Sequence, residues 1–301
     1  MKEIILELTD SKEIIEIKAI QELWSGYGVL NRVTTEKTSV IEKLINIERG
    51  KNHPRGWDTD FSHQRKAKSY EVEMNFYKNF NNEIPFAYSP RFLAAGKRGH
   101  QQYLILEDLK TKCFSPKASV NDEEIKLCLK WLAKFHAHYL GTSPTGLWEI
   151  GTYWHLDTRP DEFKAIEDIE LKKAAPLIDK KLNAAKFKTF VHGDAKLANF
   201  LFSDTEAAAV DFQYIGGGVG VKDLAYFLSS IYREDDLEKY EAKWLDYYFG
   251  ELNNLEVEKE WRGLYPYAWC DFYRFLKGWS PGHPKLNSYS EKMKDKVLKC
   301  L

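Results

Sequence analysis

Two carboxylates and a carboxamide occur at fixed offsets in one part of the chain. Residues 191–199 read VHGDAKLAN, and residues 210–213 read VDFQ. Phosphoryl transfer requires a carboxylate that orients and deprotonates the attacking hydroxyl, and oxygen ligands that hold a metal ion on the phosphates. Magnesium prefers hard oxygen ligands and keeps several waters, so one Asp and one Asn suffice. We therefore predict that Asp194 is the catalytic base, that Asn199 and Asp211 bind Mg²⁺, and that His192 braces the loop.

Each fragment alone has an ordinary explanation, because His-Gly-Asp occurs in polar turns and an aspartate is common at surfaces. Here Asp194 and Asp211 are 17 residues apart, with short apolar stretches between them that predict strands. Two loops that follow neighbouring strands can bring their side chains together. The combination therefore favours one site over two unrelated turns.

The HGDxxxxN and DFQ motifs resemble the aminoglycoside phosphotransferase and choline kinase superfamily. They are most similar to its ecdysteroid-kinase-like (CHK kinase-like) branch, which has Gln where protein kinases have Gly, as Gln213 does here. The resemblance extends over nearly the whole chain, from the turn at 24–28 to the segment 271–275. It implies a protein-kinase-like bilobal fold of the α+β class, with ATP between the lobes. It also implies that Lys196 contacts the transferred phosphate, although an outward-facing lysine is the alternative.

A kinase site of this kind needs a lysine on the third strand that reaches the ATP phosphates and a glutamate that holds the lysine. Lys43 occupies the strand position. Of the two glutamates on the predicted helix 63–80, Glu73 lies beside the apolar face and is preferred to Glu71.

Two further segments are predicted to contact the nucleotide through their backbone. Gly26 and Gly28 could lie over the phosphates, although a plain hairpin turn is the alternative reading of a lone Gly-x-Gly. Glu107 and Leu109 lie in Glu-Asp-Leu, which resembles the hinge where backbone groups meet the adenine.

Three other signals do not predict a binding site. His136 and His138 are two residues apart on a predicted helix, so their rings point in different directions and cannot share an ion. The glycine-rich stretch 216–220 follows Asp211 and does not open a helix after a strand, so it is not a phosphate loop. Asp223 resembles the superfamily's structural brace, which bonds back to the catalytic loop.

The elements that must position these residues follow from apolar periodicity. The N-terminal part predicts a small antiparallel sheet, and the remainder predicts mostly helices. Strands are predicted at 19–24, 30–34, 39–47 and 103–106, a loop at 51–62, a helix at 63–80, further helices at 122–140, 161–183, 224–231 and 235–248, and strand–loop–strand structure at 189–213. We therefore expect an ATP-binding lobe at 1–108 and a helical lobe at 109–301 that carries the catalytic loop and the acceptor site.

The acceptor is expected to be a small hydroxyl compound. A protein Ser/Thr kinase needs a long segment after its magnesium aspartate to dock a peptide, whereas eleven residues separate Asp211 from Asp223 here. Steroid- or terpenoid-like alcohols, choline-like and aminoglycoside-like acceptors all remain open. In the aromatic segment 261–279, Asp271 and Arg274 predict either one wall of an acceptor pocket or an internal ion pair of a packed helix.

Other functional classes are less well supported. An inactive nucleotide-binding scaffold is expected to lack a catalytic residue, yet Lys43, Asp194, Asn199 and Asp211 are all present. A metal-dependent phosphoesterase needs more clustered His and Asp ligands than the chain offers.

Composition argues against two classes of partner, nucleic acids and membranes. There are 44 Lys and Arg against 45 Asp and Glu, a net charge of −1, which gives no electrostatic reason to expect nucleic-acid or membrane binding. No apolar stretch is long enough to span a membrane, and the N-terminus mixes charges with apolar residues, unlike a signal peptide. The four cysteines are widely separated, as is typical of free thiols in a reducing cytoplasm.

Overall fold

A computed structural model describes residues 1–47 and 60–301. Contacts divide the chain into two units. The N-terminal unit contains Met1–Asn82 and Ser89–Ser115, and the C-terminal unit contains Glu83–Tyr88 and Pro116–Leu301. The expected boundary between residues 108 and 109 remains a prediction.

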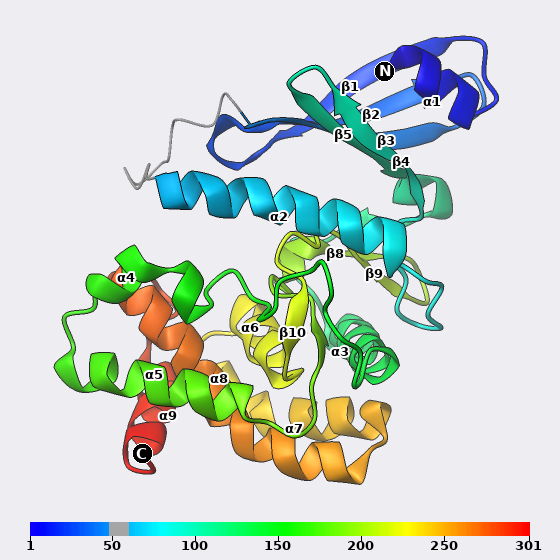
Figure 1. The fold of residues 1–301 in the computed structure, drawn as a ribbon. Coiled ribbons are helices and arrows are strands. Elements are labelled where there is room, and N and C mark those ends of the chain that lie inside the picture. The colour runs from blue at the N-terminus through cyan, green and yellow to red at the C-terminus, as the bar shows by residue number, and fades with distance from the viewer. Residues whose placement is uncertain (48–59) are drawn as a thin grey trace. The chain divides into compact units, whose positions relative to one another are not determined.

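The N-terminal unit contains a five-stranded antiparallel sheet with the strand order β1-β2-β3-β5-β4 (Figure 1). The strands are β1 (Ile14–Glu22), β2 (Gly28–Thr35), β3 (Ser39–Asn46), β4 (Phe92–Arg98) and β5 (Gln101–Glu107). The predicted strands fall on β1, β2, β3 and β5, but 19–24 is displaced, since β1 begins at Ile14. Strand β4 was not predicted, because its sequence FLAAGKR contains no β-branched residue.

Helices pack against this sheet. Helix α1 (Lys2–Leu8) buries Ile5 beside Val33, Val40 and Ile105. Helix α2 (Asp60–Asn79) contributes Tyr70 to a second cluster with Leu23, Tyr27 and Ile45. Residues 51–59 of the predicted loop lie outside the described residues. Its last three residues form the first turn of α2, where the Asp60 carboxylate suits the positive end of the helix dipole.

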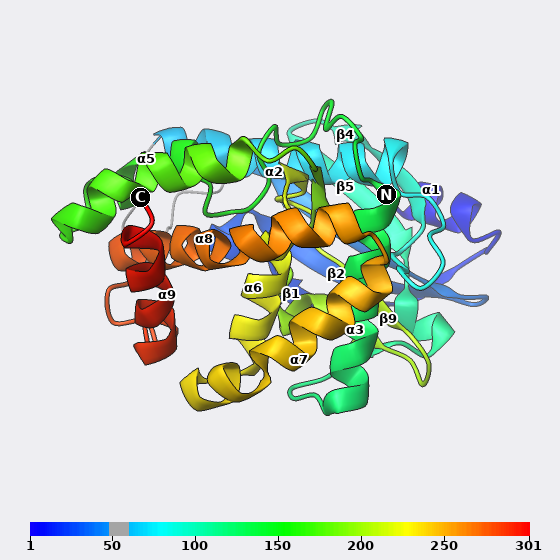
Figure 2. The same ribbon diagram turned by 90° about the horizontal axis from the view of Figure 1, so that it is seen from below.

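The C-terminal unit is mainly helical (Figures 1 and 2). Its helices are α3 (Asp122–His138), α4 (Pro160–Lys164), α5 (Ile169–Asn183), α6 (Val221–Ile231), α7 (Glu234–Leu252), α8 (Leu255–Trp279) and α9 (Ser288–Leu298). Helix α8 packs against α4, α5, α6 and α9. The single helix predicted at 161–183 is wrong, because Asp168 caps the Leu171 amide and starts α5 as a separate helix.

Short strands carry the loops of interest. They are β6 (Ser115–Pro116), β7 (Thr189–Val191), β8 (Phe200–Phe202), β9 (Ala207–Ala209) and β10 (Gly216–Gly218). Strand β10 pairs with β7, and β8 pairs with β9. A Cβ atom on Gly216 would lie 2.2 Å from the Trp148 carbonyl oxygen, so the glycines of β10 allow the segment 148–151 to pack closely. None of the helices in residues 1–47 and 60–301 is long and apolar enough to cross a membrane.

Candidate active site

The loop that follows β7 depends on a glycine. Gly193 has φ +80, and a Cβ atom there would lie 2.1 Å from the Tyr214 carbonyl oxygen. Its carbonyl oxygen accepts a hydrogen bond from the Tyr153 amide at 3.1 Å. Any other residue would be both strained and obstructed, so the His-Gly-Asp spacing follows from the backbone path.

Asp223 on α6 holds this loop in place. The backbone amides of His192 and Gly193 donate to its two carboxylate oxygens at 2.6 and 2.9 Å. The ring Nε2 of His136 lies 3.1 Å from one of these oxygens, and all of these groups are buried. A carboxylate that accepts two backbone hydrogen bonds fixes the conformation of the loop, so the predicted brace is confirmed.

His136 holds Asp223 in position from the other side. Its Nδ1 lies 2.7 Å from the hydroxyl of Tyr248, so the ring connects α7 to Asp223. His138 is exposed, so the expectation of one packed and one exposed histidine is confirmed. The structural role of His136 was missed, because its partners lie 87 and 112 residues further along the chain.

His192 connects the base to the second loop. Burial lowers the pKa of its imidazole, despite the carboxylates of Asp223, Asp194 and Asp211 nearby, so the ring is neutral at pH 7. The Asp194 amide donates to Nδ1 at 3.2 Å, so the proton sits on Nε2, which donates to the Val210 carbonyl oxygen at 3.0 Å. The neutral ring therefore ties Asp194 to the residue before Asp211, which is the predicted bracing role.

Asp194 is 7% exposed and uses its two carboxylate oxygens differently. Oδ2 accepts hydrogen bonds from Lys196 Nζ at 2.9 Å and from Asn199 Nδ2 at 3.1 Å. Oδ1 is buried and has no hydrogen bond of standard geometry in the described part of the chain, and the hydroxyl of Tyr226 is a donor close to this carboxylate. A buried acceptor without a donor costs roughly 1–3 kcal/mol, so this oxygen is suited to an incoming hydroxyl.

Asn199 and Asp211 have the donor types that Mg²⁺ prefers. Asn199 Nδ2 donates to both the carbonyl and the carboxylate of Asp194, so its amide oxygen is left for another ligand. Asp211 has φ +69, and its Oδ1 accepts a hydrogen bond from Gln213 Nε2 at 2.7 Å. Among the residues that the structure describes, no three His, Cys, Asp or Glu side chains cluster as a metal site. The oxygen donors of Asn199 and Asp211 fit Mg²⁺, which takes its remaining ligands from water and phosphates.

Lys196 points toward the base, with its side chain 38% exposed. Burial acts to lower the pKa of Lys196, but Asp194 and Asp211 together outweigh it, so the pKa is raised and the side chain is a cation at neutral pH. This geometry does not match the outward-facing alternative. Its contact with a transferred phosphate remains a prediction.

In the N-terminal unit, Lys43 of β3 and Glu73 of α2 form a buried ion pair with Nζ and Oε2 2.6 Å apart. Glu71 is exposed, so the apolar periodicity of the helix correctly predicted Glu73 as the partner of Lys43. The role of the pair in holding ATP phosphates remains a prediction.

Gly26 and Gly28 lie at the turn between β1 and β2. Gly28 has φ +144, and a Cβ atom would lie 2.0 Å from the Leu44 carbonyl oxygen, so packing of β2 on β3 requires glycine. Gly26 ends the short 3₁₀ turn Trp24–Gly26 with φ +73, and no described atom lies within 4 Å of an added Cβ. Both glycines thus have structural reasons, and their contact with phosphates remains a prediction.

Glu107 and Leu109 flank Asp108 at the end of β5. Asp108 accepts hydrogen bonds from Arg32 Nε and Ser39 Oγ, both at 2.6 Å, and it caps the 3₁₀ turn Leu109–Lys112. Burial acts to raise the pKa of Asp108, but these donors outweigh it and lower the pKa overall. The turn at the proposed adenine hinge is therefore fixed by Asp108, while adenine contacts at Glu107 and Leu109 remain predictions.

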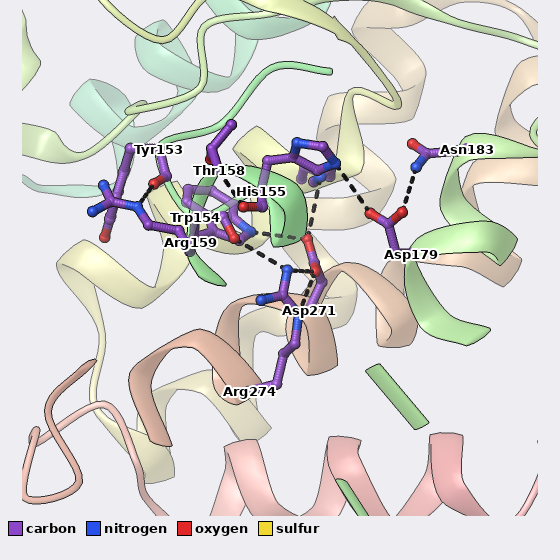
Figure 3. Close-up of polar contacts among 10 residues, drawn as sticks. Tyr153, Trp154, His155, Thr158, Arg159, Asp179, Asn183, Asp271 and Arg274 are labelled. Carbon is purple, nitrogen blue, oxygen red and sulfur yellow. Dashed lines mark hydrogen bonds and ion pairs between the residues drawn. The ribbon is translucent and has the colours of Figure 1, made fainter. Parts of the chain in front are cut away.

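Asp271 and Arg274 form a closed network in the C-terminal unit (Figure 3). Arg274 Nη2 lies 2.6 Å from Asp271 Oδ1, and Trp154 Nε1 and Lys222 Nζ lie 3.0 and 3.2 Å from Oδ2. Burial acts to raise the pKa of Asp271, but Arg274 and Lys222 lower it to about 2. The side chains of Asp271, Arg274 and Lys222 are at most 2% exposed, so the pocket-wall interpretation is wrong and the packed ion pair is confirmed.

Three side chains near Asp194 were not predicted. Tyr153, Tyr226 and Lys285 interact electrostatically with its carboxylate. Tyr226 lies three residues after Asp223, so helical spacing placed it one turn from the brace and could have indicated it. Tyr153 and Lys285 lie in loops whose sequences carry no motif.

The order of these features along the chain can be compared with known proteins. The family model described as "Phosphotransferase enzyme family" matches residues 31–266, which include Lys43, Glu73, Asp194 and Asp211. This chain belongs to the phosphotransferase enzyme family. The predicted resemblance to phosphotransferases is confirmed, whereas the narrower similarity to ecdysteroid-kinase-like proteins remains a prediction. No curated protein sequence matches the chain.

Solved structures support the fold of this phosphotransferase. It is similar to a microcompartment-associated aminopropanol kinase, with a TM-score of 0.57, 13% identity, and coverage of 98% of this chain and 91% of the other. An aminoglycoside phosphotransferase in complex with ADP and hygromycin B has a TM-score of 0.56 and 10% identity, with coverage of 99% of this chain and 98% of the other. The choline kinase LicA of Streptococcus pneumoniae has a TM-score of 0.53 and 13% identity, with coverage of 99% of this chain and 98% of the other. The predicted kinase-like fold, with a sheet followed by a helical part, is confirmed.

Proposed function

We propose that this phosphotransferase transfers the γ-phosphate of ATP to a hydroxyl group of a small metabolite, with Mg²⁺ as the metal cofactor. The observation that carries the proposal is the asymmetric environment of Asp194. Its Oδ2 is held by Lys196 and Asn199, while its buried Oδ1 has no hydrogen bond of standard geometry within the described residues. An acceptor hydroxyl that donates to Oδ1 is thereby oriented, and its proton has a carboxylate to receive it.

The other predicted residues have complementary roles. Asn199 and Asp211 would hold Mg²⁺, which when bound neutralises charge on the phosphates. Lys196 stabilises negative charge on the transferred group beside the base. Lys43 holds the phosphates of ATP, and Glu73 orients the side chain of Lys43. The proposed lobes are 1–108 for ATP and 109–301 for catalysis and the acceptor. All four cysteines are free thiols, which is consistent with the proposed cytoplasmic location.

A small acceptor is favoured over a protein. Between Asp211 and Asp223 the chain forms β10, which pairs with β7, and then enters α6 at Val221. No segment is left there to dock a peptide. Two similar folds are named for small amino alcohols, aminopropanol and choline, and small hydroxyl compounds are therefore the class to test first.

A screen of hydroxylated metabolites for ADP release tests this proposal. Wild-type protein with Mg²⁺ should release ADP in proportion to phosphorylated acceptor, and EDTA should stop the reaction. Asp194→Asn serves as the matched inactive protein. Failure to bind ATP in the presence of Mg²⁺ would contradict the kinase assignment, whereas binding without transfer to any acceptor would favour the scaffold alternative.

A further inference from the structure

Lys285 lies between α8 and α9, and its surroundings are unusual for a lysine. Its Nζ donates a hydrogen bond to Ser229 Oγ at 3.0 Å. It lies over the rings of Tyr226 and Phe272, at 4.5 and 5.4 Å from their centroids. No carboxylate of the described residues forms an ion pair with it, so its direct contacts are a hydroxyl and two aromatic faces.

Lys285 is only partly exposed, and two buried lysines of this chain have different surroundings. Lys43 pairs with Glu73 at 2.6 Å, and Lys222 lies 3.2 Å from Asp271. A lysine is rarely desolvated without an anionic partner, because removal of an ammonium ion from water is costly. Desolvation lowers the pKa of Lys285 to about 8, although the side chain keeps some exposure to solvent. The carboxylate of Asp194 acts to raise this pKa, and the charge of Lys196 acts to lower it. The side chain is therefore still mainly a cation at pH 7.

Lys285 also lies on one side of the catalytic base. Its charged neighbours are Asp194 and Lys196, whereas those of Lys196 are Asp194 and Asp211. Lys196 forms an ion pair with the base and also interacts with the proposed metal ligand, so we assign it to the transferred phosphate. Lys285 interacts with the base and with Lys196, and it lies over the ring of Tyr226, whose hydroxyl is bonded to that of Tyr153, so we assign this group of side chains to the acceptor.

Two tyrosines complete this side of the base. The hydroxyl of Tyr153 donates to that of Tyr226 at 3.2 Å, and the Tyr226 ring lies beneath Lys285. Burial raises the pKa of both tyrosines, and the nearby Asp194 adds to the shift, so both remain neutral hydrogen-bonding groups. We call Tyr153, Tyr226 and Lys285 the acceptor wall.

Buried charged side chains hold the segment of Tyr153, one member of the acceptor wall, in position (Figure 3). Arg159 Nε donates to the Tyr153 carbonyl oxygen, and Arg274 Nη2 donates to the Trp154 carbonyl oxygen at 3.1 Å. On its other side the Tyr153 amide donates to Gly193 in the catalytic loop at 3.1 Å. Tyr153 is therefore anchored to the catalytic loop and to Arg159, and its neighbour Trp154 is anchored to the Asp271–Arg274 pair, which gives that pair a positioning role.

We propose that the acceptor carries an anionic group, a carboxylate or a phosphate ester, close to the hydroxyl that is phosphorylated, and that Lys285 binds this group. The inference rests on the proposed kinase function and narrows its substrate. A negatively charged group completes the missing ion pair of Lys285, while the hydroxyl donates to Asp194. An ammonium group would instead meet the like charges of Lys285 and Lys196. Hydroxy acids and phosphorylated alcohols are thus favoured over amino alcohols.

The test uses a matched set of three-carbon hydroxyl compounds: glycerate, glycerol 3-phosphate, glycerol and 3-amino-1,2-propanediol. ADP release and product formation are measured with Mg²⁺ and ATP on wild-type protein, Lys285→Met, Lys285→Arg and the surface control Lys292→Met. Wild type should prefer an anionic member by at least about tenfold in kcat/KM, the scale of one interaction of ~1.4 kcal/mol. Preference for glycerate over glycerol 3-phosphate, or the reverse, identifies the anion. Lys285→Met should abolish the preference, and Lys285→Arg should retain most of it.

Equal or better turnover of the neutral or cationic compounds would overturn the proposal, as would a preference that survives in Lys285→Met. An equal loss on every acceptor in Lys285→Met would assign the lysine to the transferred phosphate instead and would also overturn it. If none of the four compounds is phosphorylated, each is titrated calorimetrically into wild type and into Lys285→Met. The proposal predicts that the anionic compounds bind wild type more tightly than the others do, and that Lys285→Met loses this difference. If no compound shows binding that depends on both its negative charge and Lys285, the proposal is contradicted. Failure of the kinase function is separate, because it is seen as the absence of Mg²⁺-dependent ATP binding.

Discussion

Replacement of Lys285 by methionine should stabilise the protein while it impairs the enzyme. The lysine is desolvated beside Tyr226 and Phe272 and has no ion pair among the described residues. Methionine has a similar length and removes the charge, so it can occupy the same aromatic surroundings without the cost of desolvation. A residue kept for binding at the expense of stability is expected to behave in this way.

The size of the effect follows from the pKa of Lys285, which falls from 10.5 to about 8 on folding. One pKa unit corresponds to ~1.36 kcal/mol, so the shift costs roughly 3 kcal/mol. The cost is fully present below pH 8, decreases as the pH rises, and vanishes above 10.5, because only then is the unfolded lysine also neutral. It should therefore be about 3 kcal/mol at pH 7 and about 2 kcal/mol at pH 9. Loss of the hydrogen bond to Ser229 offsets ~1 kcal/mol, and loss of the ammonium–ring contacts with Tyr226 and Phe272 offsets another ~1 kcal/mol, which leaves a net gain of about 1 kcal/mol at pH 7.

Urea unfolding followed by tryptophan fluorescence measures this gain. Seven of the nine tryptophans lie in the C-terminal unit, so the signal reports mainly on the unit that contains Lys285. Lys285→Met should unfold at higher urea than wild type, with a smaller difference at pH 9 than at pH 7. Lys292→Met, at a lysine whose side chain is 71% exposed, should change little. A neutral or destabilised Lys285→Met at pH 7 would refute the reasoning that the lysine is desolvated and unpaired.

The remaining predictions concern the Lys43–Glu73 ion pair and the hydrogen bonds that Asp223 accepts from the catalytic loop. Lys43→Ala and Glu73→Ala should each reduce kcat/KM, and the double variant should lose little more than the worse single variant, since the pair acts as one unit. Losses that multiply in this double-mutant cycle would separate the two roles. Asp223→Asn should destabilise the protein by roughly 2–4 kcal/mol, because an amide cannot accept from both backbone amides of the loop. Urea unfolding measures this, and wild-type stability would contradict the bracing role.

The parts of the site that local spacing determines could be predicted from the sequence. His192, Asp194 and Asn199 lie in one loop directly after a short apolar strand, so their relative positions depend on few backbone angles. Glu73 was selected over Glu71 by helical periodicity, and the ion pair with Lys43 shows that the face was correct. Asp223 and its contact with the loop followed from the family resemblance.

The rest depends on contacts between distant segments. Trp154 contacts Asp271, and Lys134 contacts Glu251, and each pair is separated by 117 residues in the sequence. No local sequence pattern predicts contacts between residues so far apart. Tyr153 and Lys285 lie in loops, where periodicity gives no signal. Strand β4 was missed because an Ala- and Gly-containing sequence becomes a strand only by pairing with β5.

The most direct test of the catalytic assignment compares Asp194→Asn with Asp211→Asn in two measurements, calorimetric binding of ATP with Mg²⁺ and phosphoryl transfer to an acceptor. Asp194→Asn preserves shape and removes the charge that orients the hydroxyl, so it should bind Mg²⁺ and ATP like wild type and lose about 10²–10⁴-fold in turnover. Asp211→Asn should weaken the binding itself. Near-normal transfer by Asp194→Asn would contradict the assignment of Asp194 as the base.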